Sequence, residues 1–310
     1  MVGFAILSAC SSASSGPPTG TGGSPAGAGG AQANGSGGHG TGGGTGTGAG
    51  GSTGAGGGSS AAGGSSGGGT GGASGGGCAA LPLCDTFEVT AVGAAPSAAL
   101  WTLIPSTPSG TATVDSIGAH GSSRSLKVVS NDRLYLRNSS VIGTLGPVVH
   151  ARFFARFMTA LAQGHGALVV THPVVVDQYT QQPELRFGSQ DMVFHWNTDT
   201  DSANLPDVSP NGDAASFKPV AGTWYCIELT INSGNGHLNV SIDGTDAPGL
   251  TEDGVATPNI DQAWVGSAPS LARYMAFADF NIGWQSYGAG PLTVWFDDIA
   301  LSGAPIGCGN

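Results

Sequence analysis

A long N-terminal segment of this sequence lacks charged residues. Residues 11–77 contain no Asp, Glu, Lys or Arg and almost no large apolar side chain, and Gly, Ser, Thr and Ala fill the segment. Such a composition buries too little apolar surface to offset the entropy lost on ordering the chain, which excludes a packed core there. We predict a disordered linker over residues 11–77, with a typical reach of about 45 Å for a flexible chain of that length.

Basic residues are also scarce. The chain of 310 residues has 9 Lys and Arg against 20 Asp and Glu, which gives a formal net charge of −11. A surface of that sign repels nucleic acid and anionic lipid, and no cluster of basic residues in the sequence is suited to either. Every charged residue lies beyond Cys78, in a block long enough for one large domain. We therefore expect a monomeric domain at residues 78–310 that binds no nucleic acid.

Cysteine is rare as well, with five in the chain. The spacing of Cys78, Cys84, Cys226 and Cys308 does not fit a zinc site. If Cys10 has a separate role, these four can form two disulfides in an oxidising compartment. Cys84 and Cys226 lie in predicted strands and could join neighbouring strands, while Cys78 and Cys308 flank the domain. We prefer the pairing Cys84–Cys226 with Cys78–Cys308, and the main alternative is Cys78–Cys84 with Cys226–Cys308.

The first ten residues are apolar and end in Leu7-Ser8-Ala9-Cys10. This ending resembles the lipobox of bacterial lipoprotein signal peptides, in which the Cys is lipidated and becomes the new N-terminus. The segment before it is short for a signal peptide and has no basic residue. We predict a signal peptide at residues 1–10, lipidation of Cys10, and an outer-membrane or cell-surface location with membrane contact only through the lipid.

Helical periodicity is absent beyond residue 88, where apolar residues do not recur every three to four positions. Short alternating segments separated by turn residues predict strands instead. These segments are residues 111–117, 125–129, 133–137, 148–158, 166–176, 184–187, 192–196, 223–231, 237–243, 274–284 and 292–302. So many short strands predict an all-β fold, a double-sheet antiparallel jelly roll.

The last of these segments, residues 292–302, has apolar residues on both faces, which predicts a strand in the middle of a sheet. Asp297 and Asp298 lie within it and point to opposite faces. A buried carboxylate is costly unless a hydrogen-bond donor, a counter-charge or a metal ion compensates it. The comparable segment near the start is residues 84–89, and we predict that the two segments are neighbours in one sheet.

Several short motifs occur in a fixed order along the domain. They are Phe87-Glu88, Ser123-Arg-Ser-Leu-Lys127, Gly222-Thr-Trp-Tyr-Cys-Ile-Glu228, Val240-Ser-Ile-Asp-Gly244 and Phe296-Asp-Asp-Ile299. In this order and spacing they resemble concanavalin A-like lectin/glucanase domains, and more narrowly the group that contains a fungal cellulose-induced secreted protein and the glucuronan lyases. The resemblance covers most of residues 84–308 and implies a concanavalin A-like sandwich that acts on or binds carbohydrate.

The same resemblance implies a structural calcium ion that links the first and last strands through hard oxygen ligands. The matching positions are Glu88, Ser122 and Asp298. The alternative is that Glu88 and Asp298 pair with Arg124 or Lys127 and that no metal binds.

A catalytic set is incomplete in the sequence. The glucanase motif Glu-x-Asp-x-x-Glu is absent, and of the three strand motifs of alginate-lyase-type domains only Glu184-Leu185-Arg186 has a partial match. A lyase needs a cation or amide to neutralise the uronate carboxylate and a Tyr or His to remove the C5 proton. The residues with suitable chemistry are His172, Arg186, Gln190, His195 and Tyr287. The alternative is structural: Arg186 pairs with Glu184, and His195 is a partly buried side chain.

Carbohydrate binding without catalysis needs only exposed aromatic rings and a few polar groups. The candidates are Trp196, Trp264, Trp284 and Tyr287 as rings, with Arg152, Arg186 and Asn197 as polar partners. From the sequence we favour a surface-anchored domain that binds a polysaccharide or glycan without cleaving it. The alternatives are a lyase that cleaves a uronic-acid polymer by β-elimination and a structural or adhesive domain without a ligand.

Overall fold

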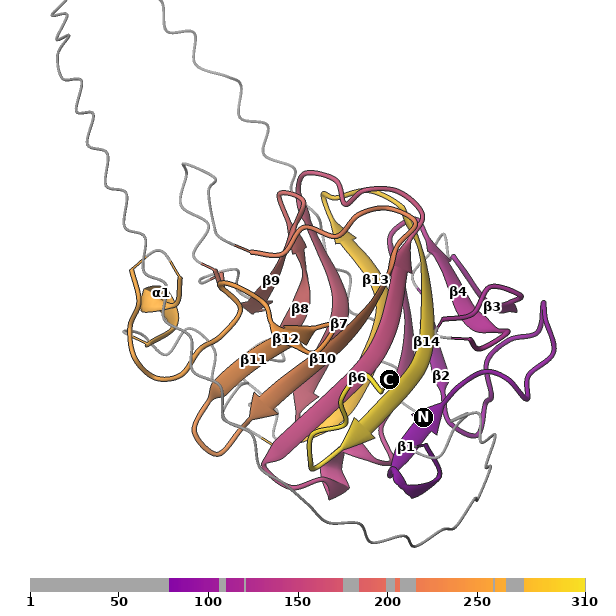
Figure 1. Cartoon of the computed structure of the whole chain (residues 1–310), viewed down its shortest axis with the longest axis horizontal. Helices are drawn as coiled ribbons and strands as arrows, with labels where there is room; N and C mark the ends of the chain where they lie inside the picture. The colour runs from indigo at the N-terminus through magenta and orange to yellow at the C-terminus, as the bar shows by residue number, and fades with distance from the viewer. Residues whose placement is uncertain are drawn as a thin grey trace, which may run out of the picture. The chain divides into compact units, whose positions relative to one another are not determined.

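The computed structural model describes residues 78–105, 110–119, 121–174, 184–198, 204–206, 216–258, 260–265 and 276–309. Cys10 and the predicted linker at residues 11–77 lie outside this part of the chain. Within it, the strands form two antiparallel sheets packed face to face (Figure 1), so the predicted all-β double-sheet fold is confirmed. None of the helices in the described ranges has the length and apolar character needed to cross a bilayer.

The larger sheet has eight strands in the order β12-β11-β10-β6-β14-β4-β3, with β1 also paired to β14. The strands are β1 (Leu83–Asp85), β3 (Thr111–Asp115), β4 (Ser125–Ser130), β6 (Val148–Phe157), β10 (Trp224–Asn232), β11 (His237–Ile242), β12 (Thr245–Asp246) and β14 (Leu292–Ser302). β14 is central, as its two apolar faces predict. The register Cys84↔Ala300 confirms that the first and last strands are neighbours.

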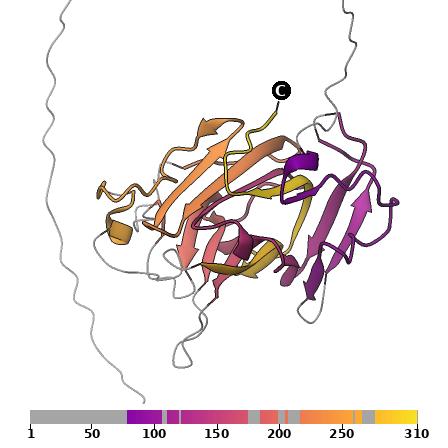
Figure 2. The same cartoon turned by 90° about the horizontal axis from the view of Figure 1, so that it is seen from below.

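The smaller sheet has six strands in the order β2-β5-β13-β7-β8-β9. They are β2 (Thr102–Pro105), β5 (Arg133–Asn138), β7 (His165–Pro173), β8 (Leu185–Gln190), β9 (Val193–Thr198) and β13 (Phe277–Tyr287). Three short helical turns complete the described elements: η1 (Cys78–Ala80), η2 (Ile142–Thr144) and α1 (Gln262–Val265). Figure 2 shows the two layers from below.

The core fills the space between the two sheets, because alternate side chains of each strand point inward. Phe153 of β6 and Phe296 of β14 contact each other edge to face, with ring centroids 5.9 Å apart. From the smaller sheet, Phe187, Phe194 and Trp196 pack with one another at centroid distances of 5.2 and 5.3 Å. All five rings are buried in one continuous cluster. The outward-facing side chains of the smaller sheet are therefore not part of this core.

The preferred disulfide pairing is wrong. The structure joins Cys78 to Cys84, with Cα atoms 5.3 Å apart, and Cys226 to Cys308, with Cα atoms 5.7 Å apart. Cys84 lies on β1 and Cys226 on β10, and β14 and β6 separate these strands. Three strand spacings amount to about 14 Å, roughly twice the Cα separation that a disulfide can bridge. The bonds place this domain in an oxidising, extracytoplasmic compartment.

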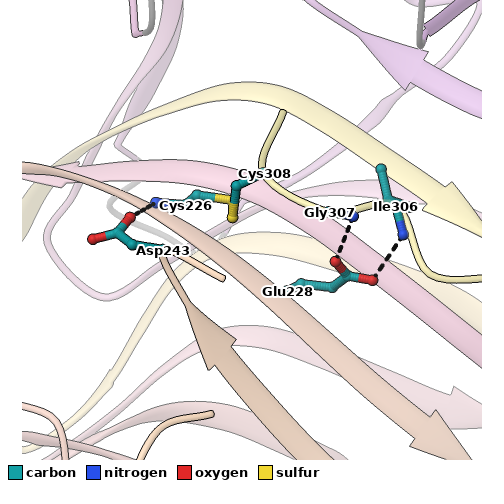
Figure 3. The surroundings of a disulfide bond; sticks show 6 residues. All are labelled: Cys226, Glu228, Asp243, Ile306, Gly307 and Cys308. Atoms are coloured by element: carbon teal, nitrogen blue, oxygen red, sulfur yellow. Dashed lines mark hydrogen bonds between the residues drawn. A yellow bond between two sulfur atoms is a disulfide. The ribbon is translucent and has the colours of Figure 1, made fainter. Parts of the chain in front are cut away.

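The C-terminal segment returns across the larger sheet to reach Cys226 (Figure 3). The Glu228 carboxylate accepts hydrogen bonds from the backbone N–H of Ile306 at 3.0 Å and of Gly307 at 2.8 Å. Burial alone would raise the pKa of Glu228, but these bonds and the contact with His150 outweigh it and lower the pKa. The disulfide and the carboxylate together hold the end of the chain against β10.

Candidate functional site

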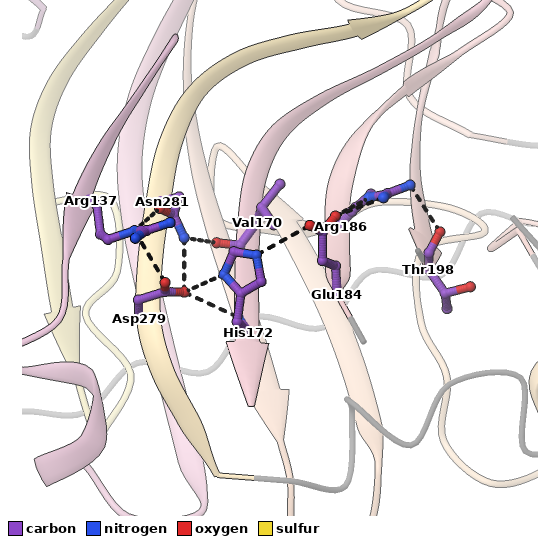
Figure 4. A network of polar contacts seen from close by, with 8 residues as sticks. All are labelled: Arg137, Val170, His172, Glu184, Arg186, Thr198, Asp279 and Asn281. Carbon is purple, nitrogen blue, oxygen red and sulfur yellow. Dashed lines mark hydrogen bonds and ion pairs between the residues drawn. The ribbon is translucent and has the colours of Figure 1, made fainter. Parts of the chain in front are cut away.

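The outer side of the smaller sheet, here called the open face, carries a continuous row of polar side chains. Along β13, Phe280 and Ile282 point into the core, whereas Asp279 and Asn281 lie on the opposite parity. Figure 4 shows this row from Arg137 on β5 to Thr198 at the end of β9. Polar groups from five adjacent strands therefore meet on one surface, as a site for an extended ligand requires, and β9 contributes the backbone carbonyl of Thr198, which accepts a hydrogen bond from Arg186 at 3.2 Å.

An alternating chain of charges runs across this face. Asp279 lies 3.2 Å from Nε of Arg137 and 2.8 Å from Nδ1 of His172. Nε2 of His172 lies 3.2 Å from Glu184, and the other oxygen of Glu184 lies 2.7 Å from Nη2 of Arg186. The expectation that Arg186 pairs with Glu184 is confirmed. These contacts fix the orientation of each side chain before any ligand arrives.

His172 is held as a cation, which corrects the prediction that it acts as a catalytic base. Burial lowers its pKa, but the hydrogen bonds and charges of Asp279 and Glu184 outweigh burial and raise the pKa to about 9. Both ring nitrogens carry a proton at neutral pH and each faces a carboxylate. A group in that state cannot accept the C5 proton of a sugar.

We expect this ion pairing to make stability depend on pH above neutrality. The pKa of His172 is about 9 in the folded protein, above its ordinary value, so its stabilising contribution is complete below about pH 6.5 and is lost as the pH rises through 9. Urea unfolding at pH 6 and pH 10 should differ by about 3 kcal/mol more for the wild type than for His172→Gln. Equal pH dependence in the two proteins would contradict the assignment.

A second cluster occupies the β8–β9 end of the open face and contains four of the predicted residues. The guanidinium of Arg186 lies 4.5 Å from the ring centre of Tyr287. Tyr287 stacks on His165 at a centroid distance of 4.9 Å, and the amide nitrogen of Asn197 lies 3.2 and 3.4 Å from the two ring nitrogens of His165. Gln190 ends β8 directly opposite His165 in the register. A cation, two amides, an imidazole and a phenol thus lie together.

His165 was missed by the sequence analysis. It begins β7, and a register shift between Ala167 and Val169 changes the parity of the strand just beyond it. A strictly alternating pattern read from the middle of β7 therefore gives no information about the face on which His165 lies. Only the pairing with neighbouring strands places it beside Tyr287.

His195 lies next to this cluster but is fully buried. Its ring is edge-on to His165 at a centroid distance of 4.9 Å. Burial, with a smaller effect of His165, lowers the pKa of His195 to about 3, so the ring is neutral. A substrate cannot reach this ring, so the prediction of His195 as a catalytic group is corrected. Its place is beneath His165, where it supports that ring.

The predicted sugar-stacking tryptophans are core residues. Trp196 and Trp284 are 1% and 2% exposed, and Trp264 is also buried. Trp284 packs directly over Gly166, where a Cβ would lie 2.0 Å from the indole ring. These rings present no surface on which a sugar could stack.

Arg152 does not belong to the open face either. It lies on β6 of the larger sheet, opposite Glu228 in the register and over the ring of Phe154. The core separates it from Arg186 and Asn197, because these two residues lie on the outer side of the other sheet. The prediction that all three contact one ligand is wrong.

A small pocket lies beside the charged row, between β2, β5, β13 and β7. Its volume is about 50 Å³, and its lining includes Arg133, Tyr135, Arg137, His172 and Asn281. Tyr135 packs in one apolar cluster with Ala167 and Val170, and Tyr287 lies against the same cluster. The pocket therefore adjoins the cluster around Tyr287.

The fold is a two-sheet jelly roll, and comparison with known proteins places it in the carbohydrate-related class. The model of the polysaccharide lyase-like family, described as the Cip1-like core domain, matches residues 95–304, and the chain belongs to this family. No curated protein matches the sequence.

A solved structure, that of the cellulose-induced protein Cip1, shows the same fold. The chain is 28% identical to the cellulose-induced protein Cip1, with a TM-score of 0.60, over 73% of this chain and 100% of that one. It is 11% identical to a sialidase, with a TM-score of 0.39, over 72% of this chain and 18% of that one. It is 15% identical to a carbohydrate esterase of the Shiga toxin-encoding bacteriophage phi24B, with a TM-score of 0.44, over 71% and 97% of the two chains. The last two similarities carry no argument about fold or function.

Proposed function

We propose that this domain is a polysaccharide lyase that cleaves a uronic-acid polymer by β-elimination at the β8–β9 end of the open face. The observation that carries the proposal is a run of three contacts, from Arg186 to Tyr287, from Tyr287 to His165 and from His165 to Asn197. Membership of the polysaccharide lyase-like family supports it. The reaction needs an acid, a base and a group that neutralises a carboxylate, and these four residues supply all three.

The elimination can be written with the groups of this cluster. The imidazole of His165 removes the proton from C5, the C4–C5 double bond forms, and the bond between C4 and the glycosidic oxygen breaks. The phenol of Tyr287 gives its proton to the leaving oxygen, so no water is consumed. Arg186 stabilises the negative charge that develops on the substrate carboxylate and on the phenol oxygen, because its guanidinium lies over the Tyr287 ring. Asn197 orients the imidazole.

Non-catalytic glycan binding, which the sequence favoured, is the second candidate. The ion pairing of Arg137, His172 and Glu184 favours it, because a network held in this way can recognise a ligand without taking part in proton transfer. Against it stands the burial of Trp196, Trp264 and Trp284, which leaves Tyr287 as the single ring among the four candidates that a sugar could stack on.

The lyase proposal is tested by incubating the purified domain with polyuronates and with neutral glycans. Each β-elimination leaves a conjugated double bond in the product, so ultraviolet absorbance should rise only with the polyuronates. Binding of a polyuronate without any rise in absorbance would contradict the lyase proposal and support non-catalytic glycan binding. Neither binding nor cleavage would leave the structural or adhesive role.

Calcium remains a proposal for the junction between the first and last strands. The Glu88 carboxylate accepts hydrogen bonds from Ser123 and Arg124, and Asp297 accepts them from Ser122 and from the backbone N–H of Ala119. Asp297, rather than the predicted Asp298, therefore contacts Ser122. Burial, aided by the charge of Asp298, raises the pKa of Asp297 to about 7. The carboxylates of Glu88 and Asp297 and the hydroxyls of Ser122 and Ser123 supply oxygen atoms of the kind that calcium prefers.

No group of three or more acidic, His or Cys residues in the described ranges surrounds a common point, so backbone oxygens would have to complete the site. We expect calcium to raise the melting temperature of the wild type and to raise it less for Asp297→Asn, because Asp297 is the carboxylate that contacts Ser122. A melting temperature that chelator leaves unchanged would contradict the metal.

We also propose that the chain is attached to the outer membrane or cell surface through lipid on Cys10. The disulfides support an extracytoplasmic domain, and the lipobox-like ending supports the anchor. Radioactive palmitate should label the wild type and not Cys10→Ala. Label retained by the variant would exclude lipidation of this residue.

A further inference from the structure

The pocket beside the charged row is separate from the groups that carry out the proposed reaction. It lies between β2, β5, β13 and β7, whereas His165, Asn197 and Arg186 lie on β7, β9 and β8. Tyr135 lines the pocket and packs in the cluster that Tyr287 also contacts. A sugar chain that places one residue at Tyr287 can therefore place another over the pocket.

The size of the pocket selects what can enter it. A volume of about 50 Å³ holds a group of a few heavy atoms, because one water needs about 10–15 Å³ on the same measure. A sugar ring needs a cleft of roughly 300 Å³ or more. The pocket can accept a substituent that projects from a ring lying on the surface, but not the ring itself.

The charge around the pocket selects an anion. Four cations (Arg133, Arg137, His172 and Arg186) and two carboxylates (Asp279 and Glu184) line or adjoin it. The local balance is two positive charges in a chain whose net charge is −11. His172 contributes to this balance at neutral pH, because its pKa is raised to about 9. Glu184, the one carboxylate in the lining, is already paired with His172 and Arg186.

The donors are also oriented before the ligand binds. Arg137 donates through Nε to Asn281 at 2.9 Å and contacts Asp279 at 3.2 Å. Asn281 in turn donates to the backbone carbonyl of Val170 at 3.0 Å and to Asp279 at 2.9 Å. Little side-chain entropy is lost when an anion contacts a network that is fixed in this way.

We propose that this pocket is a carboxylate subsite that binds a second uronate residue of the same sugar chain. The inference rests on the proposed function for the position of the first uronate. The substrate is then a polymer with closely spaced uronates rather than a neutral chain with an isolated one. Arg133 and Arg137 provide the charge that the second carboxylate meets.

The test uses two oligosaccharides of equal length, one carboxylated at every residue and one with a single uronate. Their affinities for the full chain are measured by calorimetry in the Tyr287→Phe background, so that cleavage does not consume the ligand. Arg133→Gln should weaken binding of the fully carboxylated ligand about tenfold, the effect of losing one charge-assisted contact, and should change the affinity for the other ligand less than twofold. Arg133→Lys keeps the charge and should recover most of the loss.

Arg156→Gln on β6 of the larger sheet is the matched control, since it removes the same charge far from the pocket and should leave both affinities unchanged. If Arg133→Gln weakens both ligands equally, or neither, the subsite is overturned. Its failure is separable from failure of the proposed function. A lyase without the subsite still produces unsaturated ends, whereas a non-catalytic domain with the subsite still distinguishes the two oligosaccharides.

Discussion

Replacement of Tyr287 by Phe should lower kcat for polyuronate cleavage by about 10²–10⁴-fold, the usual contribution of a general acid or base. The substitution removes only the hydroxyl. The ring that stacks on His165 at 4.9 Å and lies under Arg186 at 4.5 Å remains, so the site keeps its shape. KM should change little, because the lost group acts in the transition state. Initial rates of ultraviolet absorbance with a polyuronate measure both quantities.

Tyr135→Phe is the matched control on the same face. Tyr135 is 4% exposed, and burial together with the charges of Tyr287 and Glu184 raises its pKa well above the ordinary value. Its hydroxyl contacts only the backbone carbonyl of Ala167 among the hydrogen bonds that the structure describes for it. Its removal should change kcat by less than a few fold. A Tyr287→Phe enzyme with wild-type kcat would remove Tyr287 from the reaction, whatever the result with Tyr135.

The strands were predictable where burial alone sets the pattern. β14 has apolar residues on both faces because it lies between β6 on one side and β4 and β1 on the other. Residues 184–187 and 192–196 were predicted as separate strands, and the structure pairs them as the hairpin of β8 and β9. The turn is at Asp191 and Met192, both with positive φ, and Gly188 lies within β8. That glycine serves close packing, since a Cβ would lie 2.0 Å from the carbonyl oxygen of Gly166.

The candidate site was only partly predictable, because it depends on which strands are neighbours. Arg186, Asn197 and Tyr287 were recognised from their chemistry, and the sheet order brings them together. The tryptophans were assigned to the wrong side, since the alternation that places Arg186 and Asn197 outside places Trp196 inside. Similarly, the disulfide pairing required the order β1-β14-β6-β10, which no spacing of cysteines in the sequence contains.

Removal of the disulfide between Cys226 and Cys308 should lower the free energy of unfolding far more than removal of the one between Cys78 and Cys84. The two bonds close segments with sequence separations of 82 and 6 residues. In the chain-entropy model these loops correspond to about 4.5 and about 2 kcal/mol of stabilisation. The variant pairs Cys226→Ala with Cys308→Ala, and Cys78→Ala with Cys84→Ala, should show this order in urea unfolding under oxidising conditions.

The larger loss also has a local cause. Cys226 is 1% exposed and packs with Phe154 and Ala119, so its replacement loosens a small buried cluster on the outer side of the larger sheet. The hydrogen bonds from Ile306 and Gly307 to Glu228 then remain among the contacts that hold the C-terminal segment. Glu228→Gln in the variant without this disulfide should therefore destabilise the domain further, by about 1–3 kcal/mol for weakened bonds to a charged acceptor. Equal free energies of unfolding for the two disulfide variants would contradict this prediction, because they would show that the Cys226–Cys308 bond stabilises the domain no more than the Cys78–Cys84 bond does.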